Sequence, residues 1–381
     1  MLFWIVFSLA ITVLALVLVG WHFSNHILVP KPYTLMPEFE VLEAGDGTVT
    51  LPLPSRKEQF ADTLRTGVYN LLWQGGYGRL GEMLEQGDHR VVRKLEIVCG
   101  RPPQTGDAAR IDITVFRRDP WQDHEIPFED LSLSGESGLL RAWWVDQGAE
   151  TAVLMLHGRR RADRTETLRA MPVVVETGLS VLSLAYRNHD QSDPCSSGFY
   201  RYGAGEYRDV LTAVEFLTEH GVRHIVIYGF SMGGAVALEA LKRWPATLAQ
   251  PLALIFDSPL LDPRTVFKQG ARAMGMGIFS HPLIELVLLV GGRRAKLNWS
   301  ALDQPQSAAE ITVPVLLVAG TADQTIPIHL IDRFAERLQA PLSYRRLEGV
   351  DHVEAWNSDP EAYQGWLKTF LNDVLSVLPA A

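Results

Sequence analysis

From residue 139 onward, short apolar runs alternate with stretches of helical periodicity, and this alternation limits the fold more than any other feature of the chain. The runs that read as strands lie at 139–145, 151–156, 180–185, 223–228, 252–256, 313–319 and 342–347. The helical stretches between them lie at 163–177, 205–220, 232–243 and 328–339. Continuous apolar runs of this length are typical of strands buried on both faces, and helical crossovers between them give parallel pairing. The sequence therefore predicts an α/β fold with a mostly parallel, doubly wound sheet and helices on both faces.

The first segment of the chain is a single apolar run. Residues 2–20 contain no charged side chain, and their polar side chains are those of Ser8 and Thr12. At about 1.5 Å rise per residue they span about 28 Å, close to the thickness of a bilayer's hydrocarbon core. We expect a single-pass membrane anchor over 1–24, whose orientation is open because few basic residues flank it. A cleaved signal peptide is the alternative, although a basic n-region and a clear cleavage site are missing.

The region between the anchor and the sheet pattern is harder to interpret. Repeated prolines make 25–54 read as an extended linker, with a short strand at 48–53. Apolar residues at helical spacing then predict an amphipathic helix over 57–73, and alternation further on predicts two strands. We expect 55–138 to be an α+β region that packs on the main sheet or extends it, and 139–381 to be the main domain.

The connection 258–310 is too long to be a bare loop. It contains a segment rich in Gly and Met at 270–277 and an apolar run at 282–290. The functional interpretation is a helical lid over a site, and a plain packing insertion is the alternative. Unbranched Met side chains adapt to irregular apolar ligands, so the lid is expected to supply an apolar acyl pocket.

Charge and cysteine content exclude several classes of function. The net charge of −9 provides no general basic surface, so a nucleic-acid partner is not expected. Two cysteines in 381 residues exclude a disulfide-dense scaffold and a zinc site built from four cysteines. Whether Cys99 and Cys195 form a disulfide stays open at this point.

The segment Gly229-Phe230-Ser231-Met232-Gly233 carries the strongest chemical signal. It follows a predicted strand and opens a predicted helix, which is the context of a Gly-x-Ser-x-Gly nucleophile elbow. Gly229 and Gly233 remove side chains that would collide in so sharp a turn. We therefore expect Ser231 to be a nucleophile exposed at the carboxyl end of the sheet.

A serine hydroxyl needs a base to take its proton and an acid to orient that base. Asp323 follows the strand at 313–319, and His352 follows the strand at 342–347. The order Ser, Asp, His is the one expected on such a fold. Asp257, at the end of the strand before the long insertion, is the rival for the acid.

The oxyanion of an acyl-transfer reaction needs two backbone N–H donors. Met232, the residue after the nucleophile, is expected to supply one, and Arg159, in the loop after the strand at 151–156, the other. The basic run Arg159–Arg161, with Arg164, either attracts an anionic substrate or headgroup or is a solvated loop face.

Together these motifs resemble the α/β-hydrolase superfamily of serine hydrolases, in its membrane-anchored Bem46-like and monoacylglycerol-lipase-like branch. The resemblance spans 139–381, and its last motif departs from the common Gly-x-Gly-His. The motifs that carry it are His157-Gly158, Tyr186-Arg187-Asn188, Gly229-Phe230-Ser231-Met232-Gly233-Gly234, Asp257-Ser258-Pro259, Gly320-Thr321-Ala322-Asp323 and Gly349-Val350-Asp351-His352. In that family Ser, Asp and His form a triad, which the resemblance carries onto Ser231, Asp323 and His352.

The expected function is a serine esterase that cleaves small-molecule or lipid esters at a membrane, without a metal or an organic cofactor. A non-catalytic, membrane-tethered module that binds lipid or a protein is one alternative, and a peptidase or acyltransferase on the same fold is another. Because the proposed catalytic residues lie beyond residue 150, a fragment that begins near residue 25 is expected to be soluble and active. Substrate identity, membrane topology and oligomeric state stay open.

Overall fold

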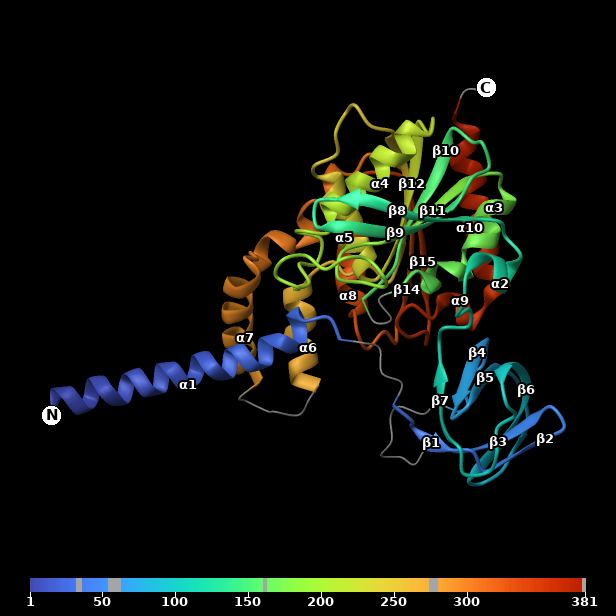
Figure 1. Ribbon diagram of the computed structural model, residues 1–381, viewed down its shortest axis with the longest axis horizontal. Coiled ribbons are helices and arrows are strands. Elements are labelled where there is room, and N and C mark those ends of the chain that lie inside the picture. Colours follow the sequence, from blue (N-terminus) through green and yellow to red (C-terminus); the bar gives the residue numbers. More distant parts are fainter. Residues whose placement is uncertain (32–35, 54–62, 160–162, 274–279, 379–381) are drawn as a thin grey trace.

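Three parts make up the chain: a long N-terminal helix, a domain of antiparallel strands and an α/β domain (Figure 1). The computed structural model describes residues 1–31, 36–53, 63–159, 163–273 and 280–378. The N-terminal helix extends away from the body of the molecule, while the two domains lie against each other.

Within the described residues, the main sheet has eight strands in the order β15-β14-β13-β12-β10-β11-β9-β8. Strands β10 to β15 run parallel, whereas β9 pairs antiparallel with β11, and β8 pairs antiparallel with β9. Their bounds are Glu129–Gly135 (β8), Gly138–Val145 (β9), Thr151–Leu156 (β10), Ser180–Ala185 (β11), His224–Phe230 (β12), Gln250–Asp257 (β13), Val315–Gly320 (β14) and Leu342–Leu347 (β15). Each strand predicted from an apolar run is present, and the predicted α/β fold class is confirmed.

Helices cover both faces of this sheet, as the apolar strands require. Neighbouring residues of one strand, such as Val153 and Leu154, point into two different apolar cores. Helices α3 and α10 pack in one core, and α4, α5 and α8 pack in the other. The helix bounds are Pro120–His124 (α2), Arg164–Arg169 (the 3-10 helix η1), Met171–Glu176 (α3), Tyr207–Glu219 (α4), Met232–Leu241 (α5), Ile328–Arg337 (α8), Ala355–Ser358 (α9) and Pro360–Ser376 (α10).

A second sheet, which we call the β domain, precedes the α/β domain. Within the described residues it has seven antiparallel strands in the order β1-β7-β4-β5-β6-β3-β2, with an apolar core of its own. The bounds are Phe39–Glu40 (β1), Glu43–Gly45 (β2), Thr48–Pro52 (β3), Tyr69–Trp73 (β4), Gly76–Gln86 (β5), Arg90–Gly100 (β6) and Ala108–Asp112 (β7). This arrangement corrects two expectations: 25–54 is not an extended linker, and most of 55–138 does not extend the main sheet, although β8 does. The short strand predicted at 48–53 is present as β3.

The amphipathic helix expected over 57–73 is also wrong where the structure describes it. Residues 54–62 lie outside the described residues, and Tyr69–Trp73 form strand β4. The helical spacing is overridden because β4 is fully buried between β5 and β7, where its backbone groups complete a ladder on each side. The short strands β1 and β2 were hidden for a similar reason, since two or three residues form a strand only when tertiary partners are present.

The long insertion 258–310 is helical, as expected. It contains α6 (Pro263–Ala273), α7 (Ser280–Ala295) and the 3-10 turns η3 (Trp299–Leu302), η4 (Gln304–Gln306) and η5 (Ala308–Glu310). Helices α6 and α7 pack against each other. The Met274, Gly275, Met276 and Gly277 of the predicted lid lie outside the described residues, and the lid role stays a prediction.

Helix α1 (Leu2–Leu28) is long and apolar enough to span a membrane, and its side chains from Phe3 through Val19 are exposed. Its last turns behave differently, because Gly20, Ser24, Ile27 and Leu28 are buried. The helix therefore runs past the expected anchor boundary at residue 24 and becomes part of the folded body.

The surface that receives α1 is helix α7 (Figure 1). A Cβ atom on Gly20 would lie 2.7 Å from Val290 Cγ2, so this glycine permits the close approach of the two helices. Arg294 of α7 stacks on the Trp21 ring and donates from Nη1 to the Trp21 carbonyl at 2.9 Å. The insertion thus holds the end of the N-terminal helix.

Candidate active site

The turn between β12 and α5 holds Ser231 in a left-handed conformation, with φ 48° and ψ −113°. A Cβ atom on Gly229 would lie 2.6 Å from the Gly234 nitrogen, and one on Gly233 would lie 2.1 Å from the Leu156 oxygen. Any larger residue would displace backbone at both positions. The local sequence thus produces the strained turn of a nucleophile elbow and leaves Ser231 partly exposed.

The structure brings three of the expected residues into one hydrogen-bonded chain. His352 Nε2 lies 2.9 Å from Ser231 Oγ, and His352 Nδ1 lies 2.7 Å from Asp323 Oδ2. The other carboxylate oxygen of Asp323 accepts hydrogen bonds from the backbone N–H groups of Thr325 and Ile326, at 2.8 and 2.7 Å. Because β14 and β15 are parallel neighbours, the loops after them meet at the edge of the sheet where Ser231 lies.

The surroundings of His352 favour its protonated form. Burial of the imidazole acts to lower its pKa, but the negative charges of Asp323, Glu166 and Asp257 outweigh burial, so the pKa lies above the ordinary value of 6.5. This is the electrostatic arrangement required by a base that must carry a proton during a reaction.

Asp257, the rival for the acid, is occupied elsewhere. It is fully buried, and its carboxylate oxygens accept hydrogen bonds from Tyr363 Oη at 2.9 Å and from Ser258 Oγ at 3.1 Å. Burial raises its pKa to about 6. The acid that contacts the His352 ring in this structure is therefore Asp323.

The two expected oxyanion donors flank Ser231. Met232 is the first residue of α5, and Arg159 ends the oxyanion loop, which we define as residues 157–159. A Cβ atom on Gly158 would lie 3.1 Å from Ser231 Cβ, so this loop passes directly beside the nucleophile. The roles of the Met232 and Arg159 N–H groups as donors stay predictions.

The basic residues Arg159–Arg161 and Arg164 do not form a solvated face where the structure describes them. Arg160 and Arg161 lie outside the described residues. The Arg159 guanidinium donates to Tyr202 Oη and to the carbonyl of His26 in α1, each at 3.1 Å. Arg164 is buried, stacks on a tryptophan ring and forms ion pairs with two aspartates. These two arginines are structural in their contacts, because internal partners occupy their guanidinium groups.

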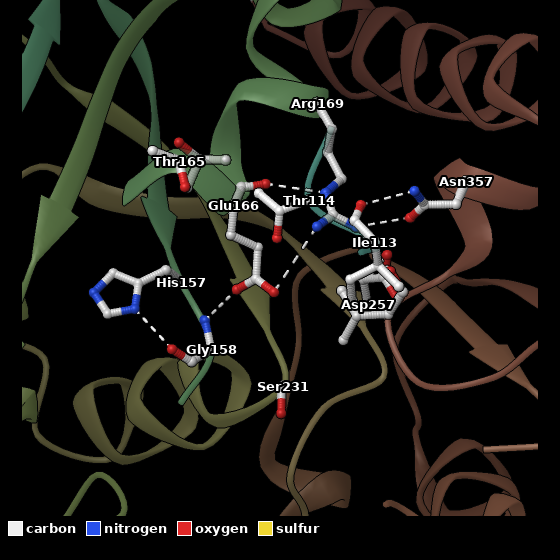
Figure 2. Close-up of polar contacts among 12 residues, drawn as sticks. Ile113, Thr114, His157, Gly158, Thr165, Glu166, Arg169, Ser231, Asp257 and Asn357 are labelled. Atoms are coloured by element: carbon white, nitrogen blue, oxygen red, sulfur yellow. Dashed lines mark hydrogen bonds and ion pairs between the residues drawn. The ribbon is translucent and has the colours of Figure 1, made fainter. Parts of the chain in front are cut away.

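Sequence reasoning missed two buried charged residues beside the site, Glu166 and Arg169 of η1 (Figure 2). Glu166 Oε2 accepts a hydrogen bond from the Gly158 N–H at 2.5 Å. Both residues lie in the stretch 163–177, where an i,i+3 pair of opposite charge reads as an ordinary exposed ion pair. Their burial depends on tertiary contacts that no local pattern reveals.

Neither a metal-binding cluster of side chains nor a disulfide is present among the described residues. Among those residues, no set of three or more His, Cys, Asp or Glu side chains is placed to hold a metal ion. Cys99 and Cys195 are both described and are not joined in a disulfide.

Comparison with known proteins finds similar sequences for both domains. Residues 40–112 match the model of a domain of unknown function, DUF8805, which corresponds closely to the β domain. The uncharacterized protein Rv2307c of Mycobacterium tuberculosis is 25% identical over 243 residues, which cover 62% of this chain and 74% of that protein.

Among solved structures, the esterase Pf2001 of Pyrococcus furiosus is similar in two crystal forms. The TM-scores are 0.54 and 0.52 at 20% and 22% identity, with 68% of this chain covered in each case and 95% and 97% of the esterase chains. At this identity the similarity shows a shared fold. Residues 153–364, more than half of the chain, match the model of the alpha/beta hydrolase family. The chain therefore belongs to the alpha/beta hydrolase family.

Proposed function

We propose that this protein is a serine hydrolase that cleaves carboxylic esters through an acyl-enzyme intermediate. The observation that carries the proposal is the continuous chain from Ser231 Oγ through the His352 ring to Asp323, with distances of 2.9 and 2.7 Å. The strained turn at Ser231 supports the same proposal, because strain of this kind persists where function requires it.

In the acylation half-reaction, Ser231 Oγ attacks the acyl carbon and His352 Nε2 takes its proton. Asp323 holds the imidazole in orientation and stabilises the imidazolium. The N–H groups of Met232 and Arg159 donate hydrogen bonds to the oxyanion, and His352 then gives the proton to the departing alcohol. The C–O bond of the ester breaks and an acyl-serine forms.

In the deacylation half-reaction, water attacks the acyl-serine while His352 acts as the base. The products are the carboxylic acid and free Ser231, which regains its proton from His352. These steps need no metal or organic cofactor.

The proposal includes attachment to a membrane through α1, so that small or lipid-like esters are the expected substrates. The support is the length and apolar character of α1 and the exposure of its side chains up to Val19. Full-length protein should sediment with membranes and resist carbonate extraction. Free protein whose N-terminus lies near Trp21 would instead identify the segment as a signal peptide.

The catalytic proposal is tested with p-nitrophenyl esters of several chain lengths and a fluorophosphonate probe. We expect turnover by the wild type, labelling at Ser231, and a loss of about 10⁴-fold or more in kcat for Ser231→Ala. A wild type that neither hydrolyses any of the esters nor takes the label would overturn the proposal.

Two buried aspartates provide a matched comparison in the same assay. Asp323→Asn should lower kcat by about 10⁴-fold, because the imidazole loses the partner that sets its tautomer. Asp257→Asn, which replaces a carboxylate that does not contact the imidazole, should lower kcat far less. Equal losses in the two variants would remove Asp323 from the assigned role.

A further inference from the structure

Beside the site lies a buried ion pair that the proposed reaction does not use. Glu166 and Arg169 are 8% and 4% exposed, and Glu166 Oε1 lies 4.0 Å from Arg169 Nη2. The second oxygen of Glu166 accepts the Gly158 N–H of the oxyanion loop at 2.5 Å (Figure 2). The carboxylate therefore holds the loop that passes beside Ser231.

The other end of the pair reaches the histidine loop, which we define as residues 348–354. Arg169 Nη1 donates to the Val353 carbonyl at 2.7 Å. Val353 has a φ of 57°, a left-handed conformation that a β-branched residue rarely adopts. Its N–H donates to Ser258 Oγ at 3.1 Å, so the peptide groups on both sides of this strained residue are held. Since Val353 directly follows His352, the strained backbone contributes to where the imidazole lies.

The same network continues into the β domain. Arg169 Nη1 lies 3.5 Å from Asn357 Oδ1, and the Asn357 amide donates to the carbonyls of Val68 and Ile113 at 2.7 and 2.8 Å. Figure 2 shows Arg169 between Glu166 and Asn357. Val68 immediately precedes β4 and Ile113 immediately follows β7, so both carbonyls belong to the edge of the β domain that faces the site.

An ion pair at the protein surface could not connect two loops in this way. A buried pair costs desolvation, and its retention is best explained where it specifies one geometry. Arg is suited to the task because its planar fork can donate in several directions at once. Arg169 uses this fork for Glu166, Val353 and Asn357.

We propose that Glu166 and Arg169 are positioning residues. They fix the position of the oxyanion loop relative to the histidine loop and link both loops to the β domain. This inference rests on the proposed function. It gives the β domain a role, which is to support the histidine loop from outside the catalytic fold.

The first test compares Glu166→Ala and Glu166→Gln with Glu239→Ala. Glu239 is a buried carboxylate of α5 that pairs with Lys242 and Arg243, away from both loops. We expect Glu166→Ala to lower kcat by about 10²-fold with little change in KM, the order found when one oxyanion donor is lost. Glu166→Gln keeps an acceptor for Gly158 and should restore most of kcat. Glu239→Ala should leave kcat near that of the wild type.

The pH profile supplies a readout that a merely structural role would not move. The charged groups near His352 are the carboxylates of Asp323, Glu166 and Asp257, with the guanidinium of Arg169 beyond Val353. The Asp351 carboxylate also lies close, because it accepts the backbone N–H of His352 at 2.7 Å. Removing the negative charge in Glu166→Gln should lower the pKa of His352. Because the base must be neutral to act, the acid limb of kcat/KM should move to lower pH.

The second test adds a measurement, amide hydrogen exchange, that does not depend on activity. Arg169→Lys keeps the charge but loses the fork, so amide hydrogen exchange in residues 351–358 should accelerate and kcat should fall by about tenfold. If the wild type hydrolyses no ester, the proposed function fails while exchange still decides the positioning role. Unchanged exchange and unchanged kcat in Arg169→Lys would overturn the inference, as would equal losses in Glu166→Ala and Glu239→Ala.

Discussion

Two regions that precede the family-matched segment, α1 and the β domain, contact opposite sides of the site in different ways. The end of α1 meets the oxyanion side through backbone carbonyls: His26 accepts from Arg159, and Ile27 accepts from Tyr202 Oη. The β domain meets the histidine side through polar side chains of Asn357 and Glu354. The last carbonyls of any helix lack partners within that helix, so α1 needs the α/β domain to satisfy its end.

Both regions therefore make hydrogen bonds with residues beside the site, in addition to being joined to the α/β domain through the chain. Arg65 of the β domain's flank forms an ion pair with Glu354 at 2.5 Å, while the four-residue helix α9 also packs on α10 and β14. The contacts of α1 bear on the expectation that a fragment beginning near residue 25 is soluble and active, which stays a prediction. A cut at that point divides the docked turns of the helix.

The largest effect should come from removing the docked turns of α1. Deletion of 2–28 should lower kcat/KM by about 10²-fold or more, because Arg159 and Tyr202 lose their acceptors and the apolar face of α7 is uncovered. Deletion of 2–18 keeps those turns and should retain activity while releasing the protein from membranes. Ester hydrolysis by the two purified fragments checks this, and equal activity would show that α1 acts as a tether without other influence on the site.

On the other side of the comparison, Asn357→Leu should uncouple the β domain. The carbonyls of Val68 and Ile113 would lose their donor, and each unsatisfied buried group costs about 1–3 kcal/mol. Urea unfolding should report this loss of stability, and kcat should fall by about tenfold as the histidine loop loosens. Thr48→Ala, on the far strand β3 of the β domain, serves as the control. A fall in stability with an unchanged kcat would separate domain docking from the positioning of His352.

A smaller effect is expected from the Arg159 side chain itself. Arg159→Ala keeps the backbone N–H but loses the contacts with Tyr202 and α1, so kcat should fall by about fivefold to tenfold. In the 2–28 deletion background the same substitution should have a smaller effect, since the His26 acceptor is already gone and the Tyr202 contact is what remains to be lost. Additive losses in a double-mutant cycle would mean that the two act independently.

The smallest expected effect is a pH signature on the histidine side. Because the folded-state pKa of His352 lies above 6.5, folding favours its protonated form. That stabilisation is complete below pH 6.5 and is lost as the pH rises through the raised pKa. The advantage of wild type over His352→Gln in free energy of unfolding should therefore shrink between about pH 6 and pH 9. The His26 and Ile27 carbonyls of α1 do not titrate, so their hydrogen bonds to Arg159 and Tyr202 contribute no such pH dependence.

Local sequence patterns predict the α/β domain well because each pattern indicates whether its own residues are buried, without reference to distant partners. Apolar runs such as 151–156 are buried on both faces wherever they lie in a parallel sheet, so their position needs no knowledge of partners. The motif around Ser231 is similarly self-contained, since its glycines and its strained turn are adjacent in the chain. Asp323 and His352 could be named because parallel strands bring the loops after them to one edge.

The β domain shows where such patterns fail. The spacing of apolar residues in 57–73 fits a helix, yet Tyr69–Trp73 form a strand because β5 and β7 complete its ladders. The ion pair of Glu166 and Arg169 is another case, since its spacing is ordinary and its burial is not visible locally.

The sequence by itself determined the α/β-hydrolase fold, the turn at Ser231 and the order of the residues proposed as a triad, because these depend on contacts that adjacent residues or strand order impose. The tertiary structure decided which aspartate faces His352, where α1 ends and what the β domain touches. Those outcomes depend on long-range packing, in which each polar group takes whichever partner the whole fold brings within reach.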